Sequence, residues 1–138
     1  MSAGRGLYTP EVLAAAMELT RYPMDDALPF KGSARSRSCG STIDIAVSLA
    51  SDGGIATVGI RPHACAVGQA SAALFARGAV GLTADDLRAA RAALGAWLAG
   101  NGLRPEWPGI ELVEPARAYP ARHGAILLAW DAAIEALK

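Results

Sequence analysis

The chain has 138 residues, which is the usual size of one domain, and its apolar fraction of 52% with 19% charged residues predicts a folded protein. Thirteen basic residues balance thirteen acidic ones, so the chain lacks the net positive charge that is typical of nucleic-acid-binding or acidic-membrane-binding proteins. No apolar run reaches the length of a membrane span, and the first residues do not resemble a secretion signal. We therefore expect one cytoplasmic domain over residues 1–138, with both of its cysteines reduced.

The middle of the first half predicts a small antiparallel sheet. Small residues alternate with arginines over 32–38, which favours an edge strand whose arginines discourage further pairing. Apolar residues alternate with polar ones over 42–49, which is the period of a half-buried strand. The turn sequence DGG then predicts a tight hairpin, and the returning strand over 55–60 is expected to stop before Pro62.

Helical periodicity surrounds this sheet in the sequence. It predicts helices that begin at four places: at Thr9, after Cys65, at Thr83 and near His123. Gly78 and Gly81 are interpreted as terminators of the second helix, and residues 103–119, which contain three prolines, as an ordered loop. Strands that precede most helices, without βαβ alternation, predict an α+β fold in which helices pack on one face of an antiparallel sheet.

Few residues with reactive side chains lie at the ends of these elements. They are Cys39 before the long strand, His63 and Cys65 between the returning strand and its helix, and His123 at the start of the last helix. A tight hairpin brings the outer ends of its two strands together, so we expect the two thiols to be neighbours. The partial positive charge at a helix N-terminus would favour the thiolate form of Cys65. His63, two residues earlier in extended chain, is expected to point to the same side.

Two soft thiolates with one or two imidazoles suit zinc, iron or an iron-sulfur cluster better than magnesium or calcium. Three ligands would leave one position open, and two chains could instead pool two cysteines each around one cluster. Two alternatives remain. Both cysteines could simply be packing residues, or Cys65 could be the nucleophile of a hydrolase or transferase with His63 or His123 as its base. No third group that would orient the base is evident, so we do not expect a turnover enzyme.

Four segments, in order along most of the chain, resemble the NifU/IscU-like family of iron-sulfur cluster scaffolds, and most closely its SufU-like branch. They are the opening helix LYTPEVLAAAMELTRYP, the first cysteine segment SCGSTIDI, the second cysteine segment HACAVGQASAALFARGAVGLTADDL, and the closing helix YPARHGAILLAWDAAIEAL. The resemblance implies a SufE/NifU-like α+β fold.

The resemblance also implies a ligand set of three cysteines and an aspartate. Cys39 matches the first cysteine and Cys65 the second, but Ser41 stands where the aspartate is expected and Ala125 where the third cysteine is expected. A hydroxyl and a methyl group do not replace a carboxylate and a thiolate as ligands. His123 lies one residue away from a place where some members carry His or Lys, which on a helix is a rotation of about 100°.

The implied function is assembly of iron-sulfur clusters from iron and from sulfide that a cysteine desulfurase supplies. Three interpretations follow for a chain with part of the ligand set. It could be a divergent scaffold that uses both cysteines with a histidine or pools cysteines in a homodimer. It could be a sulfur or metal carrier that uses Cys65. Finally, it could be an interaction protein of the assembly machinery that has lost cluster chemistry.

Overall fold

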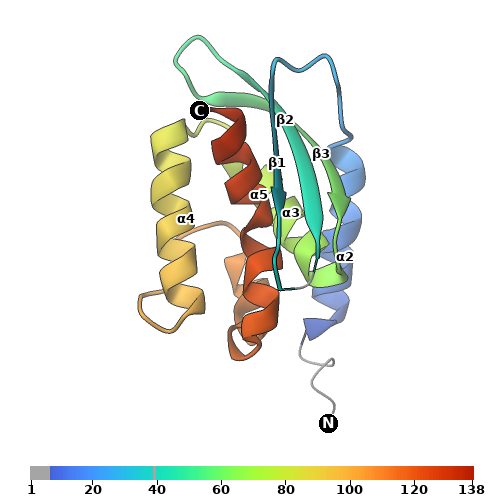
Figure 1. Ribbon diagram of the computed structural model, residues 1–138, viewed down its shortest axis with the longest axis vertical. Coiled ribbons are helices and arrows are strands. Elements are labelled where there is room, and N and C mark those ends of the chain that lie inside the picture. The colour runs from blue at the N-terminus through green and yellow to red at the C-terminus, as the bar shows by residue number, and fades with distance from the viewer. Residues whose placement is uncertain (1–6, 39) are drawn as a thin grey trace.

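The computed structural model describes residues 7–38 and 40–138 (Figure 1). Three strands, β1 (Phe30–Arg35), β2 (Thr42–Leu49) and β3 (Ile55–His63), form one antiparallel sheet in the order β1-β2-β3. Together with the helices they form an α+β fold, which confirms the predicted class. The alternation of β2 has the expected effect, because the side chains of Ile43, Ile45 and Val47 are at most 2% exposed.

The third strand is longer than the sequence predicts, because it continues through Pro62 to His63. The backbone N–H of Ile60 points away from β2 and donates to the carbonyl of Tyr22 at 2.9 Å. Residues two apart along a strand direct their N–H groups to the same edge, so the position of Pro62 needs no N–H toward β2. The proline therefore costs the sheet no hydrogen bond, and the expected stop at Ile60 is wrong.

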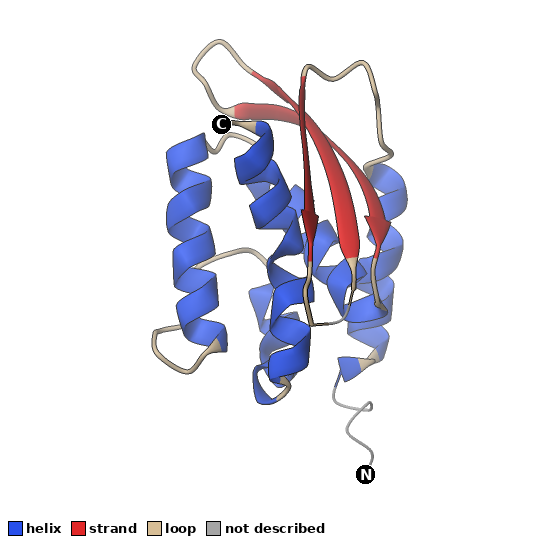
Figure 2. Cartoon of the chain, in the orientation of Figure 1, coloured by secondary structure: helices blue, strands red, loops and turns tan. Residues whose placement is uncertain are grey.

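The helices cover one face of the sheet, as predicted (Figure 2). Helix α5 (His123–Ala136) packs on β1 and β2, and α3 (Ala66–Ala79) packs beside it. Helix α2 (Pro10–Met17) packs on α3, and α4 (Ala84–Leu98) packs on α5. None of the described helices covers the sheet face that is turned to the viewer in Figure 2. None of the described helices is long and apolar enough to cross a membrane.

Capping hydrogen bonds mark two of the predicted helix starts, at Thr9 and Thr83. The side chain of Thr9 accepts a hydrogen bond from the N–H of Val12 at 3.1 Å. Thr83 and Asp86 form a reciprocal capping box at the start of α4, with distances of 3.0 and 3.2 Å. Gly81 has a φ of +89° and ends the α3 segment as predicted. Gly78 does not terminate α3 as the sequence predicted, but lies inside it. A glycine is favoured there because a Cβ would come within 2.6 Å of the ring of Trp107.

The expected loop over 103–119 is the largest departure from prediction. Residues Ile110–Ala118 form a 3₁₀ helix, η2, and two shorter 3₁₀ helices, η1 (Glu18–Arg21) and η3 (Pro120–Arg122), lie elsewhere. In η2 the buried residues recur every third position, which is the period of a 3₁₀ helix: Ile110, Val113 and Ala116. Trp107 anchors the preceding segment, because its indole N–H donates to the carbonyl of Leu74 at 2.7 Å. Its ring packs against those of Phe75 and Trp130 at centroid distances of 5.9 and 5.1 Å.

Candidate functional site

The start of β2 and the end of β3 lie at the lower end of the sheet in Figure 1. Thr42, the first residue of β2, lies opposite His63, the last residue of β3. The β1–β2 turn is closed by a bond from the N–H of Ser36 to the carbonyl of Ser41 at 2.8 Å, and by one from the N–H of Gly40 to the carbonyl of Ser36 at 3.0 Å. This turn and the connection from β3 to α3 therefore lie at the same end of the sheet. Cys39 itself lies outside the described residues.

Helix η3 and the first turn of α5 contact the same turn. The hydroxyl of Ser38 donates to the carbonyl of Ala121 at 2.9 Å. A Cβ placed on Gly124 would lie 2.6 Å from the Oγ of Ser36, so the glycine leaves space for this hydroxyl against the helix. The β1–β2 turn is thus seated on the first turn of α5, next to the position of Ala125.

Cys65 is the N-cap residue of α3 and is half-buried. Its carbonyl accepts the N–H of Gln69 at 2.9 Å, the first bond of the helix, while its side chain forms no capping hydrogen bond. The thiol therefore lies at the N-terminal end of α3, two residues after His63. The local structure places it at the end of the sheet where the sequence predicted it.

Ala125, which stands where the resemblance implies a third cysteine, lies close to the first turn of α3. A Cβ built on Gly68 would lie 3.0 Å from the Cβ of Ala64 and 3.4 Å from the Cβ of Ala125. Gly68 is one helical turn after Cys65 and leaves room between these two methyl groups. Ala125 is 1% exposed. Gly68 and Ala125, which are 57 residues apart in the sequence, are thus neighbours across α3 and α5.

Ser41, at the position of the expected aspartate, immediately precedes β2 and is 6% exposed. Because Thr42 pairs with His63, Ser41 lies beside the segment that leads to Cys65. The structure therefore brings three of the four positions of the implied ligand set, Ser41, Cys65 and Ala125, to one end of the sheet. Only one of these three carries a metal-binding side chain, and among the described residues no three Cys, His, Asp or Glu side chains gather as a metal site.

The two histidines lie in different surroundings. His63 is exposed at the end of β3, and its imidazole forms no hydrogen bond or ion pair within residues 7–38 and 40–138. His123 is half-buried, and its Nε2 lies 3.1 Å from the carbonyl oxygens of both Ala116 and Arg117. A carbonyl oxygen only accepts, so Nε2–H must donate, and this side of the imidazole faces the end of η2.

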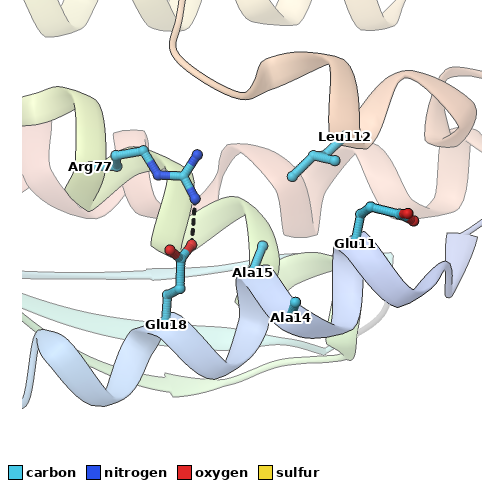
Figure 3. Close-up of a pocket in the computed structure, with 6 residues that line it drawn as sticks. All are labelled: Glu11, Ala14, Ala15, Glu18, Arg77 and Leu112. Carbon is cyan, nitrogen blue, oxygen red and sulfur yellow. Dashed lines mark hydrogen bonds and ion pairs between the residues drawn. The ribbon is translucent and has the colours of Figure 1, made fainter.

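A cavity of about 420 Å³ lies elsewhere, between α2, α3 and η2 (Figure 3). It is lined by Glu11, Ala14, Ala15, Glu18, Arg77 and Leu112. Glu18 and Arg77 form an ion pair across it. Arg77 lies in the last turn of α3, whereas Cys65 precedes the first, which corresponds to about 18 Å along the helix axis. The cavity is therefore separate from the end of the sheet that carries the cysteine.

Sequence reasoning missed the two glycines that make this end of the sheet compact, Gly68 and Gly124. Neither has the positive φ that marks a turn, and both lie inside helices, where a glycine ordinarily costs stability. Their importance depends on contacts with segments distant in the sequence. The one available signal was that each lies in a segment that also contains a position of the implied ligand set.

Comparison with solved structures identifies close structural relatives. A NifU-like protein (N-terminal) from Brucella abortus is 34% identical with a TM-score of 0.86, and the match covers 98% of this chain and 94% of that one. A protein assigned as an iron-sulfur cluster assembly scaffold for the SUF system, from Fervidobacterium islandicum AW-1, has a TM-score of 0.82 at 19% identity, over 96% of this chain and 97% of that one.

No protein-family model matches the sequence, and no curated protein matches it. The likeness to the Fervidobacterium chain, at its low identity, shows the common fold. The likeness to the Brucella chain extends over nearly all of both sequences at an identity that reflects common descent. It agrees with the four segments and with the convergence of the ligand positions, and this chain belongs to the NifU/IscU-like family.

Proposed function

We propose that this protein acts in iron-sulfur cluster assembly and holds a cluster, or a single iron or zinc ion, as cargo through Cys39 and Cys65. The solved relatives support this proposal, since one is NifU-like and another is named as a cluster assembly scaffold. The observation that carries it is the placement of Ser41, Cys65 and Ala125 at one end of the sheet.

The side chains at this end fit a cluster only in part. Cys65 supplies a half-buried sulfur, and Cys39 would supply the second. The hydroxyl of Ser41 and the methyl of Ala125 do not replace a carboxylate and a thiolate. Two thiolates leave the remaining cluster or metal positions open to a partner chain, a second copy of this chain or a small thiol. Such a site would bind its cargo weakly and release it readily.

His63 is the histidine better placed to assist, because it is exposed and lies two residues from Cys65. His123, although considered a ligand on sequence grounds, already donates its Nε2–H to the carbonyls of η2. The partner implied by this function is a cysteine desulfurase, which supplies the sulfur, and a homodimer would supply four thiols. We propose a carrier of cargo and not a turnover enzyme.

The alternative function is that of an interaction or carrier protein of the assembly machinery that has lost cluster chemistry. The observation that favours it is the loss of both donor groups from Ser41 and Ala125, two positions that remain buried in the same compact end. Under this alternative, replacing both cysteines would leave partner binding unchanged.

Anaerobic reconstitution with iron and sulfide distinguishes these two functions. We expect the wild-type protein to show visible charge-transfer absorption with equal iron and sulfide contents, and Cys65→Ser to lose at least three quarters of both. Serine is nearly isosteric and is a preferred N-cap residue, so the variant should keep the melting temperature of the wild type.

The control for this experiment is His123→Gln, which removes an imidazole that faces η2 and should keep the cluster content of the wild type. Absence of a cluster from the wild type would contradict the proposal and favour the interaction protein. A cluster that survives in Cys65→Ser would show that it is held elsewhere.

A further inference from the structure

The face of the sheet that the helices leave open has a distinct charge pattern near the cysteine end. The register places Arg35, Thr42 and His63 in one row across the three strands. The next row contains Ser33, Asp44 and Arg61. Side chains of one row point to the same face of a sheet, and the row two residues further along the strands points to that same face. Opposite them, Ile43 and Ile45 point into the core, so both rows lie on the open face.

The cations of this face outnumber its carboxylates. Asp44 accepts a hydrogen bond from Ser33 at 2.6 Å and lies 4.0 Å from Arg61, whose side chain is half exposed. Arg35 is exposed, as is Arg37 in the turn that follows β1. Neither of these two guanidinium groups forms an ion pair or a hydrogen bond in the part of the chain that the structure describes. We call Arg35 and Arg61 on the open face, together with the exposed Arg37 of the adjoining turn, the basic face.

This local excess is notable because the whole chain is neutral. Many acidic side chains lie on other elements: Glu11 on α2, Glu18 on η1, Asp85 and Asp86 on α4, Glu111 and Glu114 on η2. At Gly59 the same sheet face is covered by the segment before β1, because a Cβ there would lie 2.8 Å from the carbonyl of Pro23 and 3.1 Å from the N of Asp25. The two rows described above lie nearer the end of the sheet that carries Cys65.

We propose that the basic face is the docking surface for a carboxylate-rich surface of the protein that delivers sulfur to this chain. This inference rests on the proposed function and deepens it by naming the surface used and the chemistry of the partner. Guanidinium groups bind carboxylates in a bidentate geometry, and these residues stand on rigid strands and a short turn. A partner seated there would lie beside the connection between His63 and Cys65.

The charge distribution favours an acidic protein over a nucleic acid. Nucleic-acid-binding domains usually carry a large net positive charge and an extended basic stripe. Here the basic face contains three arginines on a neutral chain. Such a patch is sufficient to steer and orient an acidic protein surface, and its effect should weaken with salt because the charges are exposed.

The test uses the cysteine desulfurase encoded in the same genome, with binding measured by biolayer interferometry at 50 and 300 mM NaCl. The variant is Arg35→Glu/Arg37→Glu, which breaks no ion pair among the described residues. The matched control is Arg88→Glu/Arg104→Glu, which makes the same change in net charge and removes only two exposed ion pairs. A single-stranded RNA 20-mer is measured in parallel.

We expect the basic-face variant to bind the desulfurase at least tenfold more weakly at 50 mM NaCl and the control to stay within threefold of the wild type. Wild-type binding should fall at least tenfold at 300 mM NaCl. Equal weakening in both variants, no weakening in the basic-face variant, no binding by the wild type, or tighter binding of the RNA would each overturn the proposal. Cluster reconstitution of the basic-face variant should match the wild type, so a failed docking surface and a failed cluster site give different results.

Discussion

Restoring the two missing ligands, in the variant Ser41→Asp/Ala125→Cys, is expected to tighten zinc binding by about 100-fold or more relative to the wild type. A closed tetrahedral zinc site needs four protein ligands, and the variant would present an aspartate with three cysteines. Zinc is the probe because it needs neither sulfide nor a redox partner. The affinity is measured anaerobically by competition with a chromophoric chelator.

The structure gives the physical reason for this expectation. Ser41 precedes the residue that pairs with His63, and Ala125 faces the room left by Gly68 beside Ala64. The new sulfur and carboxylate would therefore lie at the end of the sheet that carries Cys65. A charged carboxylate is more costly to bury than a hydroxyl at a position that is 6% exposed, so the zinc-free variant should melt at a lower temperature than the wild type.

The single variants Ser41→Asp and Ala125→Cys serve as controls and should each have an intermediate zinc affinity. Zinc at 100 times its dissociation constant should stabilise the double variant by about 2.7 kcal/mol. A double variant that binds zinc no better than the wild type, while keeping its fold, would show that these positions do not share a site.

Gly32→Ala is expected to lower the free energy of unfolding by about 3 kcal/mol, because the added methyl meets the backbone of α5. A Cβ on Gly32 would lie 2.2 Å from the carbonyl oxygen of Ala132 and 2.5 Å from the N of Ala136. These atoms belong to a helix backbone and cannot move alone. The helix would have to separate from β1, and buried apolar contacts between the helix and the sheet would be lost. Urea denaturation followed by circular dichroism measures the change.

Gly95→Ala is the matched control, since it makes the same chemical change inside α4. A Cβ there would meet only the Nη1 of Arg91, at 3.2 Å, at the end of a flexible side chain. Replacing a glycine within a helix by alanine should raise the stability by about 0.5–1 kcal/mol. If Gly32→Ala were no less stable than the wild type, the close contact between β1 and α5 would be contradicted.

The sequence predicted the elements whose signals are local. The alternation over 42–49, the glycine turn of the hairpin and the capping box at Thr83 all depend on neighbours in the chain, and each is present in the structure. The 3₁₀ helix η2 was missed because three prolines over residues 103–119 suggested a loop, whereas burial of every third residue against the aromatic core stabilises a helix there.

Only those parts of the candidate site that have a local sequence signal could be predicted. The location of Cys65 at the start of a helix followed from local pattern. The proximity of Ala125 to Gly68, by contrast, depends on how α5 crosses α3, and no local signal specifies that contact. The carbonyl partners of His123 depend on η2, which was itself not predicted. Whether the thiols of Cys39 and Cys65 share one cargo stays a prediction.

The most direct test of that prediction is anaerobic alkylation of the reconstituted protein, followed by mass spectrometry of the peptides that contain each cysteine. We predict that Cys39 and Cys65 are both alkylated in the cluster-free protein. In the reconstituted protein, the fraction of each cysteine that escapes alkylation should equal the fraction of protein that carries a cluster. Protection that scales with cluster content at both residues would show that these two thiols hold the cargo. Equal alkylation of both cysteines with and without iron and sulfide would contradict the proposed cluster site.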